Sequence, residues 1–121
     1  MMDAYTCAWA DLPEDSPIEL LTRKTVKGER MMVARVALEK GCHVKCHRHE
    51  SEQISVMVSG RAIWRIGDDG SPDRREVTTT GGEIIVLPSN VAHSVDVLED
   101  AVFIDILSPI GPMGVDSQGK R

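Results

Sequence analysis

Three histidines and one glutamine stand at spacings that suit a metal site. His47 and His49 are separated by one residue, so on an extended strand both imidazoles lie on one face, with Cα atoms roughly 6–7 Å apart. Imidazoles at that separation can reach one metal ion at about 2.1 Å. Gln53 follows after a short polar link, and His93 comes forty residues later, just after a Pro-Ser-Asn turn. We therefore expect one divalent metal ion, with His47, His49, Gln53 and His93 as its ligands.

This set of donors is electrically neutral. Three imidazoles and an amide leave a divalent ion with its full charge, whereas a carboxylate in place of Gln53 would cancel half of it. The ion is then a stronger Lewis acid and a better site for anionic ligands. Glu52 is a rival ligand, but strand alternation aims it away from the face of Gln53. Imidazole and amide donors suit Zn, Ni, Fe, Mn and Co with modest discrimination, so the identity of the metal stays open.

Asp105 is the candidate catalytic residue because it interrupts an apolar strand, Val102 to Leu107. A carboxylate in such a strand must be hydrogen-bonded, or desolvation raises its pKa. If Asp105 faces the metal, it can act as a general acid and base. If it lies on the outer face, it pairs with an arginine. The residues alone leave both alternatives open.

The other histidine and cysteine side chains of this region are not expected to bind the metal. His43 shares the parity of His47, but roughly 13 Å of strand separates them, so we expect it at the rim. Cys42 and Cys46 have the opposite parity and should point away from the ion. The chain has three cysteines, an odd number, so a disulfide framework is not favoured. A structural zinc site would need a second thiol pair, which is missing.

Short β-branched runs separated by Gly, Pro, Asp and Ser dominate the chain, and no segment keeps a helical period over ten residues. This pattern is typical of a β-sandwich or barrel. We therefore predict an all-β fold with strands over residues 31–38, 53–58, 62–66, 76–80, 83–87, 92–98 and 101–107. The best helix signal, from Ser16 to Glu19, allows two turns at most. An extended arm that leads to an edge strand is an equally good interpretation of that segment.

Both faces of the strand over residues 53–58 are expected to be buried against other parts of the protein or a partner. Odd-numbered positions from Gln53 to Met57 share one face, and the apolar even-numbered positions from Ile54 to Val58 share the other. One face can line a barrel interior, and the other must pack on an arm or a partner subunit. Together with an N-terminal arm that carries Trp9 and several leucines, this surface predicts a homodimer.

We divide the chain into an N-terminal arm over residues 1–30, a barrel over 31–108 and a C-terminal tail over 109–121. The tail is rich in Gly and Pro. It either covers the barrel mouth or is disordered, and its composition favours disorder. Trp64 and Phe103 are expected in the core rather than on a platform for a ligand.

Composition excludes several classes of function. The 121 residues make one domain of ordinary size, with 14 basic and 19 acidic side chains and a net charge of −5. A net-acidic chain with no long basic run is a poor partner for nucleic acid. No apolar stretch approaches the roughly 20 residues of a membrane-spanning helix, and the first residues lack the basic start of a signal peptide. We therefore expect a cytoplasmic protein that binds neither nucleic acid nor membrane.

The spacing of these residues resembles the two motifs of the cupin superfamily. The family motifs usually read G-x5-H-x-H-x3-4-E-x6-G and G-x5-P-x-G-x2-H-x3-N. The matching stretches are Gly41-x5-His47-x-His49-x3-Gln53-x6-Gly60 and Gly82-x5-Pro88-x-Asn90-x2-His93. The chain departs from the motifs at Gln53, Asn90 and Val97. The resemblance implies a double-stranded β-helix jelly-roll barrel with one metal ion inside it.

Within that superfamily, the chain looks most like the uronate-ketonising cupins of pectin and alginate breakdown. The resemblance is carried by His-x-His-x3-Gln with a later His, by the block from Pro88 to Ser94, and by the block from Asp105 to Pro109. It implies a functional Asp at Asp105. Where that family has a Phe and an Arg, this chain has Leu107 and Gly111. An arginine fork would hold a uronate carboxylate in a bidentate fashion, so this substrate loses its expected anchor.

Three functions follow from these observations. The first is a metal-dependent enzyme of the isomerase, tautomerase or lyase type that acts on a small anionic, oxygen-rich metabolite, with Asp105 moving the proton. The second is an iron dioxygenase, since three histidines with open positions can bind ferrous ion and O₂. The third is a non-catalytic module that binds a metal or a small ligand, as a sensor does. Fold alone does not choose among them.

Overall fold

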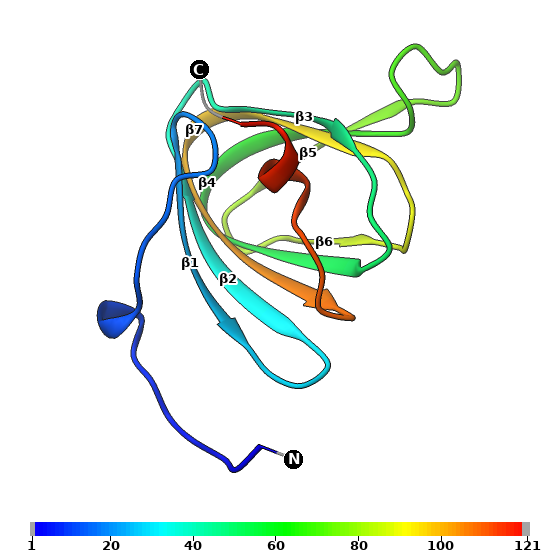
Figure 1. Ribbon diagram of the computed structural model, residues 1–121. Helices are drawn as coiled ribbons and strands as arrows, with labels where there is room; N and C mark the ends of the chain where they lie inside the picture. Colours follow the sequence, from blue (N-terminus) through cyan, green and yellow to red (C-terminus); the bar gives the residue numbers. More distant parts are fainter. Residues whose placement is uncertain (1, 120–121) are drawn as a thin grey trace.

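Seven strands and two short 3₁₀ helices follow one another along the chain in the computed structural model, which describes residues 2–119 (Figure 1). The elements are η1 (Trp9–Asp11), β1 (Leu21–Lys27), β2 (Met32–Leu38), β3 (His43–His47), β4 (Glu52–Ile66), β5 (Arg75–Thr80), β6 (Ile84–Leu87), β7 (His93–Ser108) and η2 (Gly114–Ser117). All neighbouring strands pair antiparallel. The predicted all-β jelly-roll barrel is confirmed. No helix among residues 2–119 is long and apolar enough to cross a membrane.

Two long strands, β4 and β7, hold the barrel together because each takes part in both of its halves. They pair with each other from Glu52–Ser108 to Ile66–His93. In one half, β2 and β6 flank this pair and β1 forms the edge; in the other half, β3 and β5 flank it. The predicted strands 53–58 and 62–66 are therefore one bent strand, and so are 92–98 and 101–107.

Gly60 explains why β4 bends without ending. Its φ of 90° lies in the left-handed region, and a Cβ at this position would overlap the backbone of Asp100 and Ala101 on β7. The pairing of β4 with β7 shifts register on either side of this point. Such shifts are β-bulges, which increase local twist and turn a strand from one half of a barrel into the other. The break expected between the strands 53–58 and 62–66 is therefore a bulge inside one strand.

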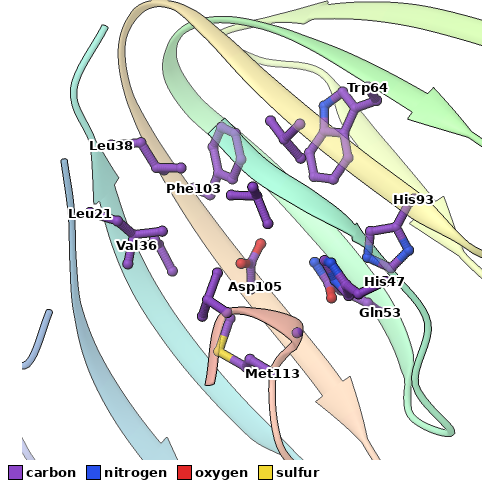
Figure 2. A pocket seen from close by; sticks show the side chains of 14 residues that line it. Leu21, Val36, Leu38, His47, Gln53, Trp64, His93, Phe103, Asp105 and Met113 are labelled. Carbon is purple, nitrogen blue, oxygen red and sulfur yellow. The ribbon is translucent and has the colours of Figure 1, made fainter. Parts of the chain in front are cut away.

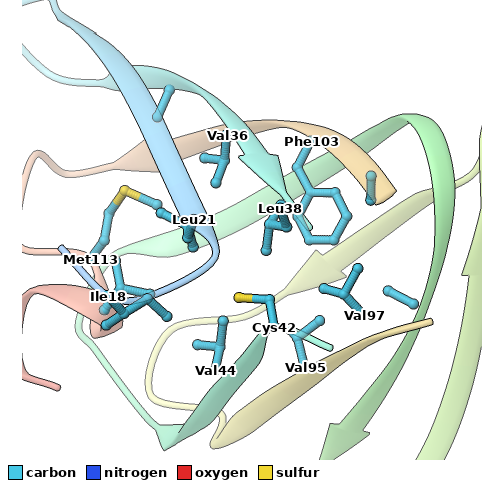
Figure 3. Packing of buried hydrophobic residues seen from close by; sticks show 14 of the residues in the cluster. Ile18, Leu21, Val36, Leu38, Cys42, Val44, Val95, Val97, Phe103 and Met113 are labelled. Atoms are coloured by element: carbon cyan, nitrogen blue, oxygen red, sulfur yellow. The ribbon is translucent and has the colours of Figure 1, made fainter. Parts of the chain in front are cut away.

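The barrel interior is the hydrophobic core (Figure 3). Strand alternation is obeyed on β4 before Gly60, where Met57 is buried while Val58 is 56% exposed. After the bulge the inward parity is even, and Trp64 is buried. Trp64 stacks on Phe103 with ring centroids 5.5 Å apart, and its indole N–H donates to Thr79 Oγ1. Both aromatic residues lie in the core, as the sequence predicted.

The N-terminal segment runs along the outside of the barrel before it joins the sheet (Figure 1). No helix forms at Ser16: its hydroxyl lies 2.6 Å from the carbonyl oxygen of Leu21 and 3.0 Å from that of Ile18, and it does not cap a helix. The segment then becomes the edge strand β1, which pairs with β2 over its full length from Leu21 to Lys27. The sheet therefore begins inside the segment that we assigned to the arm.

Candidate metal centre

His47 reaches the barrel interior because β3 carries a bulge. From Val44 to His47, β3 has one residue more than the facing stretch of β7, which runs from Val95 to His93. Val44 and Cys42, before the bulge, are buried in the core, and His47, after it, also lines the cavity. Cys42 is not part of the histidine cluster, as expected, but the reason given for this is wrong. The extra residue reverses the parity, so Cys42 lies in the barrel core and not outside it. Burial raises the pKa of the Cys42 thiol to about 11.

The three predicted histidine ligands come together at one end of the barrel. His47 ends β3, His93 begins β7 directly opposite it, and His49 lies in the loop that leads to β4. Their ring centroids are 4.3–5.5 Å apart, and their ligand nitrogens lie within 4.8 Å of one another. One ion can therefore sit within roughly 2.8 Å of all three nitrogens, and small side-chain shifts bring it to bonding distance. His43 lies outside this group, is exposed, and pairs with Asp96 on the surface.

Backbone carbonyls fix the tautomer of all three rings. The Nδ1 atoms of His47, His49 and His93 lie 2.7, 2.8 and 2.9 Å from the carbonyl oxygens of Lys45, Ser51 and Val91. A carbonyl oxygen can only accept, so each Nδ1 carries the proton. Each Nε2 then presents a lone pair, which is the arrangement that metal-binding histidines adopt.

The Nε2 atoms of these histidines are available to bind a metal ion. Within residues 2–119, the buried Nε2 atoms of His49 and His93 make no hydrogen bond. A buried polar atom without a partner costs free energy, so it indicates an ion, a water or a ligand that completes it. Burial lowers the pKa of His93 to about 4 and also lowers that of His47. Both rings are therefore neutral near pH 7 and available to a cation, so the donor set fits a divalent metal.

Gln53 lines the same cavity as His47 and His93 and is buried (Figure 2). It lies near the start of β4, opposite Leu107 of β7. Its neighbour Glu52 is exposed, as strand alternation predicts, so the rival carboxylate points to solvent. The placement of Gln53 agrees with the expected ligand set, and its role as a ligand remains a prediction.

Asp105 faces the barrel interior, and Figure 2 shows its carboxylate among the residues that line the cavity. It is 4% exposed, and its Oδ1 accepts a hydrogen bond of 2.7 Å from the hydroxyl of Ser55. Desolvation raises the pKa of Asp105 to about 6, and the bond from Ser55 opposes that rise. The alternative in which Asp105 lies outside and pairs with an arginine is excluded.

The C-terminal segment covers the mouth of the barrel above these residues (Figure 1). Met113 and Val115 are buried and line the cavity, and Gly114 lies against the ring of His47. An ion pair between Arg23 and Asp116 holds the segment on β1. The side chain of Gln118 holds it on β3, because it bonds to both the N–H and the carbonyl of Lys45.

The predicted disorder of the tail is wrong for residues 109–119. Glycine and proline suggested a flexible chain, but two apolar side chains in that segment gain enough burial to order it. Residues 120 and 121, which belong to the same prediction, lie outside the described part of the chain.

The cavity is small and partly open, and none of the described residues that line it has a cationic side chain. Its accessible volume is about 40 Å³, which is room for roughly three water molecules. Arg35 is exposed, Arg61 pairs with Glu99, and Arg65 pairs with Glu76 and Asp96. None of these three arginines therefore supplies the anchor that Gly111 lacks.

Sequence reasoning missed two parts of the site. Ser55 is fully buried and bonds to both Gln53 and Asp105, and its parity on β4 already placed it on the face of Gln53. Met113 and Val115 were hidden by the glycine and proline around them. The alternation of two apolar residues with Gly114 was the available signal.

Comparisons with known proteins agree with this fold. A family model described as "Cupin domain" matches residues 34–107. An RmlC-like cupin from Shewanella frigidimarina superposes with a TM-score of 0.77 at 20% identity, over 89% of this chain and 93% of that one. KdgF from a Halomonas species gives a TM-score of 0.76 at 22% identity, over 90% and 96% of the two chains.

Larger cupins share the fold as well. Oxalate decarboxylase from Bacillus subtilis, a protein with Mn(II) centres, superposes with a TM-score of 0.76 at 19% identity. The match covers 92% of this chain and only 32% of the decarboxylase. A search of curated protein sequences found no match. Because the family model covers more than half of its residues, the chain belongs to the cupin family.

Proposed function

We propose that this cupin is a metal-dependent enzyme of the isomerase, tautomerase or lyase type that acts on a small anionic, oxygen-rich metabolite. One observation carries the proposal. Three histidines converge, two of them with a buried Nε2 that has no partner, and His47 and His93 line the same cavity as a buried carboxyl group. A cluster of ligands next to an acid with a perturbed pKa is the usual composition of a catalytic site.

His47, His49, His93 and Gln53 would hold the metal, which is Zn, Ni, Fe, Mn or Co. When bound, the ion supplies Lewis acidity toward the oxygens of a chelating ligand. All four donors are uncharged, so they do not reduce the attraction of the site for an anion. This favours ligands with two adjacent oxygens, such as a hydroxy-, keto- or sugar acid.

Asp105 is the proposed general acid and base. Its pKa of about 6 lies close to neutrality, so the carboxyl group can both take and return a proton under ordinary conditions. Ser55 holds one carboxylate oxygen and fixes the orientation of the group. Leu38, Phe103 and Met113 form apolar walls of the cavity that Asp105 lines.

The size of the cavity restricts the substrate. Room for roughly three water molecules favours small hydroxy- and keto-acids while Met113 and Val115 cover the mouth. A uronate is larger, so its entry requires the C-terminal segment to move. A uronate also lacks the arginine that anchors it in the family, because position 111 is glycine.

The covered mouth also favours a second candidate, a non-catalytic module that retains a metal or a small ligand as a sensor does. Activity assays on metal-loaded protein separate the two. The first substrate to test is unsaturated galacturonate, whose conversion removes its ultraviolet absorbance, with wild type beside Asp105→Asn. A panel of small hydroxy- and keto-acids follows, scored by turnover and by the shift in melting temperature.

Each result decides between the candidates. Turnover by wild type that Asp105→Asn abolishes supports the enzyme and the role of Asp105. Equal turnover by both proteins shows that Asp105 is not the acid and base. If acids raise the melting temperature but none is converted, the binding module is the better description. If metal-loaded protein binds none of them, the proposed ligand class is wrong.

The proposal includes a homodimer in a reducing compartment such as the cytoplasm. Ile54, Val58, Ile84 and Val86 are exposed on the outer face of β4 and β6 and form one apolar surface on two paired strands. Apolar surfaces of this kind usually mark an interface.

Cys7, Cys42 and Cys46 are all free thiols, as expected in a reducing compartment.

A further inference from the structure

Ser55 connects the proposed metal ligand Gln53 to the proposed acid Asp105. It lies on β4 two residues after Gln53 and directly opposite Asp105 of β7, and its side chain is fully buried. Its Oγ lies 2.9 Å from Nε2 of Gln53 and 2.7 Å from Oδ1 of Asp105. The three side chains therefore form one chain of hydrogen bonds along the inner face of the barrel.

The number of protons in this chain fixes the direction of both bonds. A hydroxyl has a single proton, and an ionised carboxylate can only accept. While Asp105 is ionised, Ser55 therefore donates to it and has only lone pairs left for Gln53. The amide must then turn its N–H group toward Ser55, and Oε1 becomes its other end, within the cavity that Gln53 shares with His47 and His93.

We propose that Ser55 is a positioning residue that selects the orientation of the Gln53 amide in which the oxygen is available to the metal. The inference rests on the proposed function, because it requires Gln53 to be a ligand. An amide oxygen binds divalent cations, whereas an amide NH₂ group offers them only protons. Without Ser55, the two orientations of the amide are no longer distinguished, and part of the population presents the wrong end.

The first test compares metal affinity in Ser55→Ala and wild type, measured by competition with a chromophoric chelator. Loss of a hydrogen bond that orients a ligand typically weakens metal binding by about 10–100-fold, and we expect a loss in this range. Thr79→Val is the matched control, because it also removes a buried hydroxyl that bonds to a core side chain, in this case the indole of Trp64. It should bind metal as wild type does.

The second test repeats the comparison with Glu at position 53. A carboxylate presents an oxygen at either end, so a ligand of this kind needs no selection between two orientations. Ser55→Ala should therefore cost less than about threefold in affinity when combined with Gln53→Glu. If it costs as much there as in wild type, Ser55 acts through general packing and the inference is overturned.

The visible spectrum of Co(II)-loaded protein gives an independent readout, because it reports the donors around the ion. Ser55→Ala should change this spectrum in the same direction as Gln53→Ala, whereas Thr79→Val should leave it unchanged. If the spectrum of Ser55→Ala is identical to that of wild type, the inference is contradicted, even if the variant is less stable.

The outcomes separate this inference from the proposed function. If wild type binds no divalent metal, both fail. If wild type binds metal and Gln53→Ala has the same affinity, Gln53 is not a ligand, and the inference falls while the histidine site remains. If Gln53→Ala weakens binding and Ser55→Ala does not, only the role of Ser55 is wrong.

Discussion

Gly114 of the C-terminal segment lies so close to the imidazole ring of His47 that a Cβ atom at position 114 would overlap the ring. The segment that closes the barrel mouth is thus in direct contact with a proposed metal ligand. Only glycine permits this approach, because any other residue must displace either the segment or the histidine. Closure of the mouth and the geometry of the metal site are therefore linked.

This contact predicts the effect of Gly114→Ala. The added methyl group should cost about 1–3 kcal/mol of stability and weaken metal binding, since His47 or the segment has to move. Gly28→Ala is the control, because a Cβ at that position meets only one backbone atom, at 3.4 Å. Thermal unfolding and chelator competition measure both effects. Metal affinity equal to that of wild type in Gly114→Ala would show that the close approach is not maintained.

The histidines differ in their predicted contributions to metal binding. His93→Ala should weaken the affinity for a divalent metal on the order of a hundredfold or more, because one of three imidazole donors is lost. His43→Ala should have no effect, since His43 is exposed and pairs with Asp96. Isothermal titration of the metal-free proteins gives both affinities. Equal losses in the two variants would contradict the assignment of the site.

The pKa of Asp105 predicts a change in stability with pH. It rises from 3.8 in the unfolded chain to about 6 in the folded protein. Between these values the folded state keeps a proton that the unfolded state releases, so the contribution of Asp105 to stability falls as pH increases. Above about pH 6, the buried carboxylate lowers the free energy of unfolding by on the order of 2–3 kcal/mol.

Asp105→Asn removes this cost. With metal removed by a chelator, the variant should be more stable than wild type at pH 8, and the difference should disappear near pH 4. Denaturant unfolding at the two values measures it. The change in stability with pH that arises from His93 is common to both proteins, so it cancels in the difference between them. A difference that does not vary with pH would show that Asp105 does not titrate in this range.

The exposed apolar face predicts self-association. Ile84 is 61% exposed and lies on the outer face of β6 beside β4. Wild type should have the mass of a dimer in light scattering at micromolar concentration, and Ile84→Lys should have that of a monomer, because it places a charge on the apolar surface. Thr78→Lys on β5 is the control for an added charge. A monomeric wild type would exclude the dimer.

The barrel and its inner face could be predicted from the sequence because both depend on local alternation. The parity of β4 correctly separated Gln53 from Glu52, and the spacing of His47, His49 and His93 correctly predicted that they meet. These inferences need only a strand period of two and the known spacing of metal ligands.

The errors arose where an element departs from regular geometry or depends on distant contacts. The bulge in β3 reversed the parity of Cys42 relative to His47, and no local composition marks such a bulge. The order of the C-terminal segment depends on Arg23, far away in the sequence, and on a barrel mouth that exists only after folding. The orientation of Asp105 remained open because its strand is apolar on both faces.

The most direct test of the account is the position of the metal itself. Crystals of wild type loaded with one equivalent of Zn(II), measured at the zinc absorption edge, should show one anomalous peak per chain at the mouth of the barrel. The peak should lie about 2.0–2.3 Å from Nε2 of His47, His49 and His93 and from Oε1 of Gln53. A peak elsewhere, or a zinc ion that the three histidines do not share, would contradict the metal centre on which the proposed function depends.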